Sequence, residues 1–482
     1  MSRFTSSFRD PSGCCCSFQG RIFRLVGVDA IPQFETFLES KFARNAVASK
    51  QFVSTRRLND AQLIELRQAP DFTRLFPFPA STAVYEHDRI PFASYPHEWP
   101  PEMLWAAGNL TLELAQAALK DGYLLKDATP YNVLFRGSSP VFVDALSFDR
   151  ADPHNPLWMP DAQFNRTFSL PLLANRRWQM RLADIFTTHR DGIELEDVYR
   201  YCGKLERLNP RTLSLVSIPT WLSRSARPDD AKIYQPIHLK NAEKARFILD
   251  SLFKRRRRNL QALEPDAHKK STWSDYMASH SYNDPAFAAK EKFVRDVLVE
   301  FKPARVLDVG ANTGHFSALA AKSGASVVAV DSDPACVGGI WQRAKRDSLD
   351  ILPLVIDIAR PSPAMGWRNG ECPSFLDRAA GEFDGVLMLA LIHHLLVAER
   401  IPLDEILRLA ADLTRSWVVV EFVAPEDDMF RRLTRGRESL HASLTVSFFE
   451  QACLRRFDIV RQLLLPGTQR RLYCLKRKEG TP

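Results

Sequence analysis

The 482-residue sequence lacks most of the features that mark secreted, membrane or metal-binding proteins. No apolar run reaches the roughly 18 residues that a membrane-spanning helix needs. The first residues, with Arg3 and Arg9 among serines and phenylalanines, lack the apolar core of a signal peptide. Eight cysteines are present, three of them adjacent at Cys14 to Cys16, but no Cys-x-x-Cys pair indicates zinc or redox exchange. These absences predict a cytoplasmic protein with reduced thiols, no metal site and no membrane association.

The positive charge is concentrated in the first half of the chain. Residues 1–270 hold 38 Lys and Arg against 30 Asp and Glu, whereas the remainder holds 27 of each. Residues 254–258 are five consecutive cations, which suit the carboxyl end of a solvated helix. A phosphate-contacting patch for nucleic acid is the alternative. No interleaved aromatic residues accompany the run, so the solvated helix end is favoured over nucleic acid.

The most informative stretch, residues 305–331, has the pattern of a strand, a glycine turn, a helix and a second strand. An apolar run containing Asp308 stops at Gly310, Gly314 opens a helical pattern, and a β-branched run ends on Asp331. In parallel sheets, ligands lie beyond the carboxyl ends of the strands, where a carboxylate after the second strand can hold ribose hydroxyls. The segment therefore predicts a site for an adenosine-containing ligand.

The spacing of this turn favours one adenosine ligand over another. It reads Asp-x-Gly-x-x-x-Gly, which differs from the Gly-x-Gly-x-x-Gly fingerprint of dinucleotide sites. Asp308 at the strand tip would repel a pyrophosphate but not an amino acid that carries a sulfonium. S-adenosylmethionine (SAM) therefore fits better than NAD.

Three further strands are predicted, each followed by a polar residue. Residues 351–356 lead to Asp357, residues 383–391 to His393, and residues 417–420 to Glu421. Because the carboxyl ends of parallel strands meet at one edge, these residues are predicted to share an edge with Asp308 and Asp331. A neutral imidazole near pH 7 can accept a proton, so His393 and Glu421 are the catalytic candidates. A lone histidine after an apolar run is more often a core residue. His393, however, is adjacent to His394 and is predicted at the same edge as Asp308 and Asp331, which supports a place in the site.

The front half contains one segment whose polar residues suggest a catalytic or binding function, residues 124–148. Asp127 and Asn132 stand five apart, and Asp144 follows the second of two short apolar strands. Protein kinases use this order, with an Asp that orients the acceptor hydroxyl and an Asn and a later Asp that hold magnesium. Neither a glycine-rich loop nor a lysine strand is apparent between Arg21 and Pro101. The segment is therefore expected to be a scaffold or substrate platform that does not bind ATP.

Five sequence blocks together resemble the class I SAM-dependent methyltransferases, and within them a bacterial two-part group that includes nodulation-associated members. The blocks lie at residues 125–135, 140–148, 308–317, 390–395 and 421–423. The resemblance implies that the back half binds SAM and leaves the methyl acceptor unassigned. The residues it implies for the cofactor are Asp308, Gly310, Ala311, Asn312 and Gly314 around the methionine end, Asp331 at the ribose and Asp357 at the adenine.

The expected fold is α/β, with a Rossmann-like methyltransferase domain over residues 266–482. An α+β domain, partly kinase-like, is expected to precede it over residues 1–265. The expected function is SAM-dependent methyl transfer to an unidentified acceptor. The alternative is a scaffold or binding protein whose back half only senses the cofactor.

Overall fold

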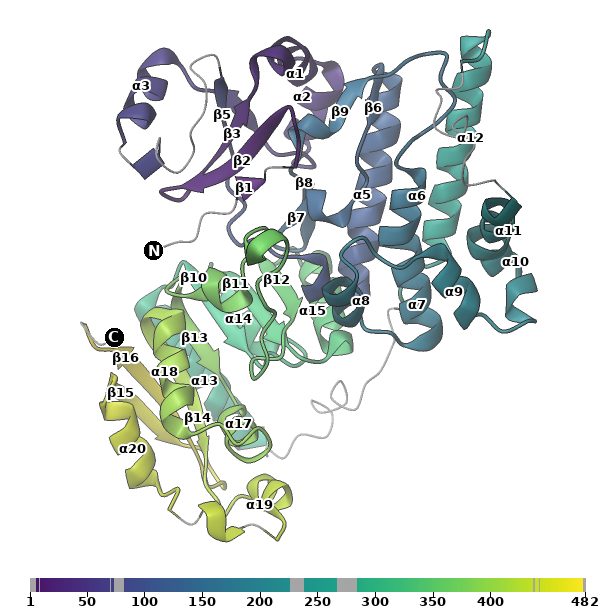
Figure 1. The fold of residues 1–482 in the computed structure, drawn as a ribbon. Coiled ribbons are helices and arrows are strands. Elements are labelled where there is room, and N and C mark those ends of the chain that lie inside the picture. Colours follow the sequence, from purple (N-terminus) through teal and green to yellow (C-terminus); the bar gives the residue numbers. More distant parts are fainter. Residues whose placement is uncertain are drawn as a thin grey trace. The chain divides into compact units, whose positions relative to one another are not determined.

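The computed structural model describes residues 6–7, 9–69, 71–72, 82–225, 238–266, 284–436, 438–441 and 443–479. The chain divides into two compact units, and neither is continuous in sequence (Figure 1). Unit 1 comprises Met1–Arg136, Pro140–Pro265 and Ala364–Pro373. Unit 2 comprises Gly137–Ser139, Asp266–Pro363 and Ser374–Pro482.

Unit 1 begins with an antiparallel sheet in the strand order β1-β2-β3-β5-β4. Its strands are β1 (Ser6–Ser7), β2 (Gly13–Phe18), β3 (Arg21–Val26), β4 (Thr55–Arg57) and β5 (Ala83–His87). The alternation over residues 13–26, with a turn at Gln19 and Gly20, predicts a hairpin, and β2 and β3 confirm it: the two turn residues have φ of 48° and 76°. Cys16 is buried in an apolar cluster, and burial raises the pKa of all three adjacent thiols. These cysteines therefore pack as small apolar side chains.

The helices that follow are shorter than the apolar spacing suggests. The repeat of Phe34, Leu38 and Phe42 predicts a single helix, but the structure has α1 (Ile31–Leu38) and α2 (Lys41–Ala48). The break occurs at Ser40, whose side chain accepts a hydrogen bond from the Ala43 amide and caps the second helix. α3 (Asp60–Gln68) then precedes β5.

The amphipathic pattern over residues 103–120 predicts a long helix, which is α5 (Pro101–Lys120), and it leads into two small antiparallel sheets. β6 (Tyr123–Leu125) pairs with β9 (Phe148–Arg150), and β7 (Val133–Arg136) pairs with β8 (Ser139–Phe142). Asp127 and Asn132 lie between β6 and β7, and Asp144 lies between β8 and β9. The two sheets thus bring the loops that carry these three residues close together.

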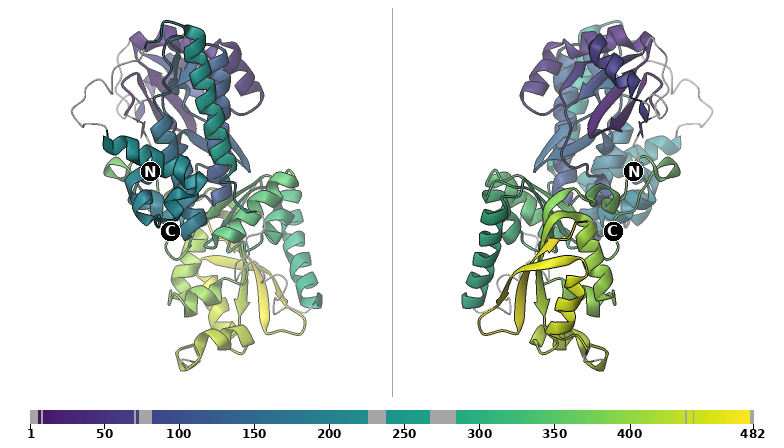
Figure 2. Two further views of the ribbon diagram at one scale, coloured as in Figure 1. Left: turned by 90° about the vertical axis from the view of Figure 1, so that its right-hand side faces the viewer. Right: turned by 90° about the vertical axis from the view of Figure 1, so that its left-hand side faces the viewer.

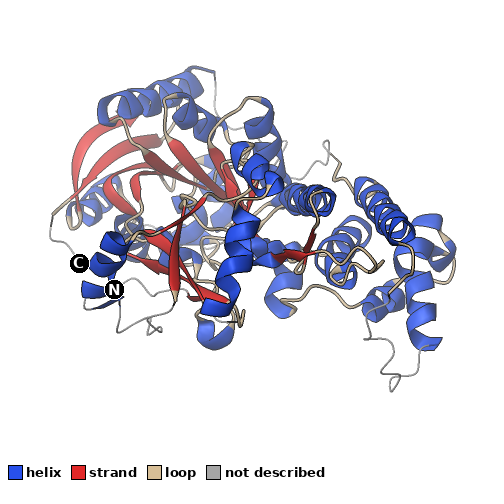
Figure 3. Cartoon of the chain, turned by 90° about the horizontal axis from the view of Figure 1, so that it is seen from above, coloured by secondary structure: helices blue, strands red, loops and turns tan. Residues whose placement is uncertain are grey.

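The rest of unit 1 is helical over the described residues 161–225 and 238–261, drawn in blue in Figure 3. Its helices are α6 (Asp161–Phe164), α7 (Leu170–Trp178), α8 (Leu182–Thr188), α9 (Leu195–Tyr201), α10 (Pro210–Thr212), α11 (Ile218–Ser225) and α12 (Ala242–Gln261). The basic run lies in α12, and the expectation that it is solvated is wrong for Arg256. That side chain is buried, and its guanidinium lies 2.5 Å from Asp161 at two nitrogens.

Unit 2 is built on a seven-stranded sheet in the order β12-β11-β10-β13-β14-β16-β15. Its strands are β10 (Arg305–Val309), β11 (Ser326–Asp331), β12 (Ile351–Val355), β13 (Phe383–Met388), β14 (Thr414–Val423), β15 (Phe457–Leu464) and β16 (Arg470–Arg477). The predicted parallel strands are confirmed by the pairings among β10 to β14. The antiparallel pair β15–β16, yellow in Figure 2, extends the sheet at one edge beyond the prediction.

The strands predicted over residues 351–356 and 383–391 end earlier, at Val355 and Met388, and a third strand end changes the place of a candidate residue. Glu421 was expected just beyond its strand, but β14 continues to Val423. The strand continues because it pairs with β16 as far as Val423 and Arg470. Glu421 therefore lies inside the sheet, with its side chain fully buried.

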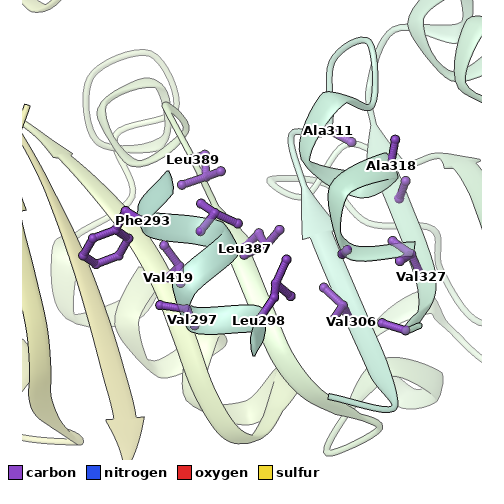
Figure 4. Close-up of a cluster of buried hydrophobic side chains, with 14 of the residues drawn as sticks. Phe293, Val297, Leu298, Val306, Ala311, Ala318, Val327, Leu387, Leu389 and Val419 are labelled. Atoms are coloured by element: carbon purple, nitrogen blue, oxygen red, sulfur yellow. The ribbon is translucent and has the colours of Figure 1, made fainter. Parts of the chain in front are cut away.

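Helices cover the sheet of unit 2. They are α13 (Asp284–Phe301), α14 (His315–Lys322), α15 (Pro334–Arg346), α16 (Phe375–Ala379), α17 (Ile392–Val397), α18 (Leu403–Leu413), α19 (Asp428–Thr434) and α20 (Val446–Leu454). Figure 4 shows the core beneath α13 and α14, where Val297 and Leu298 face Leu387 and Val419. α18 packs on β13 and β14, and α20 packs on β15. This packing fixes the carboxyl edge on which the candidate residues lie.

Candidate functional site

The strand order of unit 2 creates a topological switch point between β10 and β13. The chain builds β10, β11 and β12 outward in one direction and then returns to the other side of β10 with β13. In open α/β sheets, ligands bind in the crevice at such a point, beyond the carboxyl ends of the strands. The glycine turn after β10 lies there, and a Cβ at Gly310 would meet Leu391 at 3.3 Å.

The turn itself is built from left-handed backbone. Gly310, Asn312 and Gly314 have φ of 73°, 50° and 74°. A Cβ at Gly314 would lie 2.8 Å from Cγ1 of Ile340, closer than real Cβ atoms approach their neighbours. The amides of Gly310 and Ala311 both donate to the carbonyl of Val330. The backbone is thus held at the edge of the sheet without side chains in the way of a ligand.

Asp331, the last residue of β11, is held by this turn. Its Oδ2 accepts from the Asn312 amide at 2.8 Å, and its Oδ1 accepts from the Asp333 amide at 2.9 Å. Burial raises the pKa of the carboxyl, while these backbone donors oppose the rise. Each oxygen has a second lone pair, so the carboxylate can still accept two ligand hydroxyls.

Asp308 is more deeply buried and has a neutral hydrogen-bond partner. Its side chain is 3% exposed, and its Oδ2 accepts from the Ser317 hydroxyl at 2.6 Å. Burial raises its pKa to about 6, with the charge of Asp331 adding to the rise and Ser317 opposing it. A cationic ligand group at this position would remove the cost of ionising the carboxyl.

Asp357 lies two residues beyond the end of β12, as predicted, but it is already engaged. Its Oδ1 accepts from the Ala359 amide at 3.0 Å, and its Oδ2 lies 2.9 Å from the Arg360 guanidinium. Arg360 also pairs with Glu399. The side chain remains about a third exposed at 36%, so it is accessible from solvent.

His393 is a buried, neutral residue on α17. Burial lowers its pKa to about 3, with the adjacent His394 contributing. The two rings lie 4.2 Å apart between centroids. Its Nδ1 has no hydrogen-bond partner among the residues that the structure describes. His393 therefore stays uncharged at physiological pH and offers one unsatisfied nitrogen.

Glu421 belongs to a buried network of four charges. Lys290 of α13 donates to it at 2.6 Å, and Arg470 of β16 lies 3.5 Å away. Arg470 in turn pairs with Asp427 at 2.8 Å. Although burial works against it, Arg470 lowers the pKa of Asp427, whereas burial lowers the pKa of Lys290. Glu421 is thus an ion-pair partner inside the sheet.

Neither cation of this network was predicted, although the sequence carries a signal for each. Lys290 falls on the apolar stripe of its helix with Phe287, Val294 and Val297. Arg470 alternates with Leu472 and Cys474 on a buried strand face. A charged residue on an apolar stripe needs a buried partner. Applied to Lys290 or Arg470, this rule predicts a buried acidic partner, and in the structure that partner is Glu421.

A pocket of about 660 Å³ lies among α17, α18, α19 and α20. Its volume falls within the range of small-molecule sites, and most of its lining is apolar, as in such sites. The polar side chains in the lining include Arg400, Asp404, His441 and Arg455. Arg455 pairs with Asp404, whereas Arg400 forms no ion pair with any residue that the structure describes. No pattern in the sequence predicts this pocket, because its walls come from four separate segments.

The structure thus brings several candidate residues to one edge. The charge of Asp331 acts on Asp308, and the charges of Glu421 and Arg470 act on His393. Lys290 connects the two groups, because its charge acts on Asp308 and it pairs with Glu421. Over the described ranges, no group of three or more His, Cys, Asp or Glu side chains could hold a metal ion, and no helix is long and apolar enough to cross a membrane.

Residues 282–456 match the model of a family described as a methyltransferase domain. Together with the glycine turn and the acidic strand ends already described, this match identifies residues 282–456 as a SAM-dependent methyltransferase domain. Nodulation protein NoeA of Rhizobium meliloti (strain 1021) is 29% identical over 483 residues, which span 99% of this chain and 96% of that protein. The cofactor of the methyltransferase domain of this chain is SAM.

Two solved structures are similar at a lower level. The N-methyltransferase NodS of Bradyrhizobium japonicum WM9 in complex with S-adenosyl-L-homocysteine is 15% identical over 45% of this chain and 98% of its own, with a TM-score of 0.32. The bifunctional kinase-methyltransferase WbdD is 19% identical over 44% of this chain and 42% of its own, with a TM-score of 0.31. TM-scores this low support no conclusion about this chain.

Proposed function

We propose that unit 2 transfers a methyl group from SAM, held at the switch point between β10 and β13, to an acceptor that enters beside α17. The observation that carries this proposal is the buried carboxyl of Asp308, which has a raised pKa and a neutral partner beside a left-handed glycine turn. SAM supplies an activated methyl group on a sulfonium when bound. The chain's own residues then have to bind SAM, orient its methyl group toward the acceptor and exclude water.

Each cofactor residue is assigned to the part of SAM whose charge and shape it complements. Asp308 complements the positive methionine end, and the turn at Gly310, Ala311, Asn312 and Gly314 lets the backbone approach it. Asp331 accepts the ribose hydroxyls with its remaining lone pairs. Asp357 faces the adenine amine, which requires its carboxylate to be shared with Arg360.

His393 and Glu421 take different roles on the acceptor side. The Nδ1 of His393 is the proton acceptor, but a base whose pKa is about 3 is weak. The acceptor atom must therefore be nucleophilic by itself, with alignment supplying most of the rate. Glu421 is a positioning residue, because it holds Lys290 and Arg470 in place.

The pocket between α17 and α20 is where we place the body of the acceptor. Its lining includes Leu396, Leu433, Leu444 and Phe448, which favour an apolar group. Arg400 is the lining cation without an ion-pair partner in the described part of the chain. The acceptor is therefore an apolar molecule with one negatively charged group.

Calorimetric titration of SAM and S-adenosylhomocysteine into the full-length protein tests the cofactor half of the proposal. We expect both to bind with dissociation constants in the micromolar range. If neither binds at concentrations up to about 1 mM while the protein is folded, the proposed function is wrong.

The pocket is tested with the fluorescent probe 1-anilinonaphthalene-8-sulfonate, an apolar molecule that carries one anionic group. Ala452→Trp fills the pocket from α20, and Leu454→Trp on the same helix is the control because that side chain is 47% exposed. We expect Ala452→Trp to weaken probe binding at least about tenfold, which corresponds to 1.4 kcal/mol. Equal binding by both variants, with SAM affinity unchanged, places the acceptor elsewhere.

A further inference from the structure

The three kinase-ordered residues of unit 1 form one hydrogen-bonded cluster. The amide nitrogen of Asn132 donates to Asp127 at 3.4 Å and to the Ser147 hydroxyl at 3.2 Å. Ser147 donates to Asp144 at 2.5 Å, and Gln163 donates to Asp127. The loop between β6 and β7 and the turn after β8 are therefore joined through side chains, not only through the sheets.

A buried arginine from the sheet completes this cluster. Arg24 of β3 has a side chain that is 7% exposed, and its guanidinium lies 2.9 Å from Asp144. Its Nε donates to the Nε2 of His87 at 3.0 Å, and burial, with Arg24 adding to it, lowers the pKa of His87 to about 3. A neutral His87 can accept that bond. Arg24 lies in the stretch from Arg21 to Pro101, where no lysine strand of the kinase kind is apparent.

The cluster combines what a metal-bound phosphate needs. Asp144 is 24% exposed, so solvent reaches it, and burial raises the pKa of Asp127 with the charge of Asp144 adding to the rise. Magnesium is usually held by one or two carboxylates together with phosphate oxygens, and it needs no cage of three acidic side chains. Guanidinium groups bind phosphate oxygens in a fixed, bidentate geometry. A carboxylate, an amide and a guanidinium therefore meet at one place.

We propose that this cluster in unit 1 binds a magnesium-bound triphosphate, with the metal on Asp144 and Asn132 and a phosphate oxygen on Arg24. Such a ligand carries both signs of charge. The ion pair between Arg24 and Asp144 can separate only if each partner gains an opposite charge in exchange, because an unpaired buried charge is costly. A metal-bound phosphate meets that condition, whereas a lone cation or a lone anion does not. The proposal concerns binding and is independent of methyl transfer in unit 2.

The test is calorimetric titration of the full-length protein with ATP, GTP and inorganic tripolyphosphate, each with and without excess magnesium, and with magnesium chloride alone. We expect binding only when magnesium and a triphosphate are both present. Tighter binding of ATP or GTP than of tripolyphosphate identifies the source as a nucleotide, whereas equal binding identifies the triphosphate itself.

Variants locate the site. Asn132→Ala removes a proposed metal ligand without leaving a buried charge, and we expect it to weaken binding at least tenfold. Arg24→Lys, which keeps the charge, should retain binding that Arg24→Met loses. Asp149→Asn is the matched control, because this nearby carboxylate pairs with Lys126 outside the cluster. Circular dichroism and the thermal unfolding of each variant report that unit 1 is folded.

Three results would overturn the proposal. The first is no heat from any magnesium triphosphate at up to about 5 mM. The second is equal affinity with and without magnesium. The third is affinity that Asn132→Ala and Asp149→Asn leave equally unchanged, which would place the binding elsewhere.

Discussion

Asp308 in unit 2 and Asp144 in unit 1 are both carboxylates at strand ends, but they differ in what neutralises them. Asp308 is hydrogen-bonded to the neutral Ser317, and burial raises its pKa to about 6. Asp144 lies 2.9 Å from the buried guanidinium of Arg24. The first carboxylate is short of positive charge, whereas the second already has its counter-charge.

This difference indicates what each site can bind. A site that is short of positive charge gains by accepting a cation, which suits the sulfonium and ammonium of SAM. An ion pair that is already neutral, such as Arg24 with Asp144, is opened only by a ligand that carries both charges, which suits a metal-bound phosphate. Charge balance within the protein thus discriminates between a ligand that carries a sulfonium and a metal-bound phosphate.

The largest effect is expected from removing Lys290, the cation whose charge acts on Asp308. Lys290→Met leaves Glu421 buried beside Arg470 alone, and the free energy of unfolding of unit 2 should fall by about 3–5 kcal/mol. Lys292→Met on the same helix removes an exposed i,i+4 pair with Asp296 and should cost less than about 0.5 kcal/mol. Denaturant unfolding followed by circular dichroism measures both. Similar losses in the two variants would show that the buried network is not stabilising.

The next effect concerns the carboxylate that accepts the ribose. Asp331→Ala removes charge-assisted hydrogen bonds of roughly 1.5–3 kcal/mol each, so SAM should bind at least tenfold more weakly. Asp347→Ala, which removes an exposed carboxylate paired with Arg346, should leave the affinity unchanged. Calorimetry at pH 7.5 measures both, and an unchanged dissociation constant for Asp331→Ala would place the ribose elsewhere.

A smaller loss is expected at the turn that shapes the site. Gly314→Ala forces a Cβ to within 2.8 Å of Ile340 at a φ of 74°. The left-handed backbone alone costs about 1–2 kcal/mol, equivalent to roughly 5- to 30-fold in SAM affinity if it acts on the bound state. Gly339→Ala is the control, since a Cβ there meets nothing within 4 Å. Matching affinities and melting temperatures in the two variants would show that the turn can adapt.

The smallest effect is expected from a change of pH, which alters SAM affinity through the ionisation of Asp308. Asp308 must be ionised to pair with a cation, so SAM affinity should rise from pH 5 to pH 7, by about tenfold per unit below the pKa of about 6. The stability of the free protein changes in the opposite sense. Because the folded state holds this proton more tightly than the unfolded state, the contribution of Asp308 falls as pH rises from about 4 to 6. SAM affinity that is flat between pH 5 and pH 7 would contradict the assignment.

Much of unit 2 could be predicted from the sequence, because its central strands are apolar runs that stop at Gly310, Asp331 and Asp357. The antiparallel pair β15–β16 was not predicted, since exposed and half-buried residues alternate along β15 and give no continuous apolar signal. Glu421 was misplaced for the converse reason. A glutamate after an apolar run is typical of a strand end, and only its pairing with β16 and the reach of Lys290 keep it inside the sheet.

In unit 1, the sequence revealed the order of Asp127, Asn132 and Asp144 but not the cation they meet. Arg24 stands between Phe23 and Leu25 in a short strand buried on both faces, where a search for a lysine motif does not find it. Its partner lies 120 positions further along the chain. The pocket beside α17 was equally hidden, because four helices have to pack before its walls exist.

The discontinuity of unit 1 has a consequence during synthesis. Glu371, which belongs to this unit, forms ion pairs with Arg9 and Arg190. The segment Ala364–Pro373 leaves the ribosome about 100 residues after the rest of unit 1, roughly 5 to 20 s later at common rates of elongation. During that interval the two arginines have no Glu371. The unit that comes first in the gene can therefore be completed only after three of the seven strands of the methyltransferase sheet have been made.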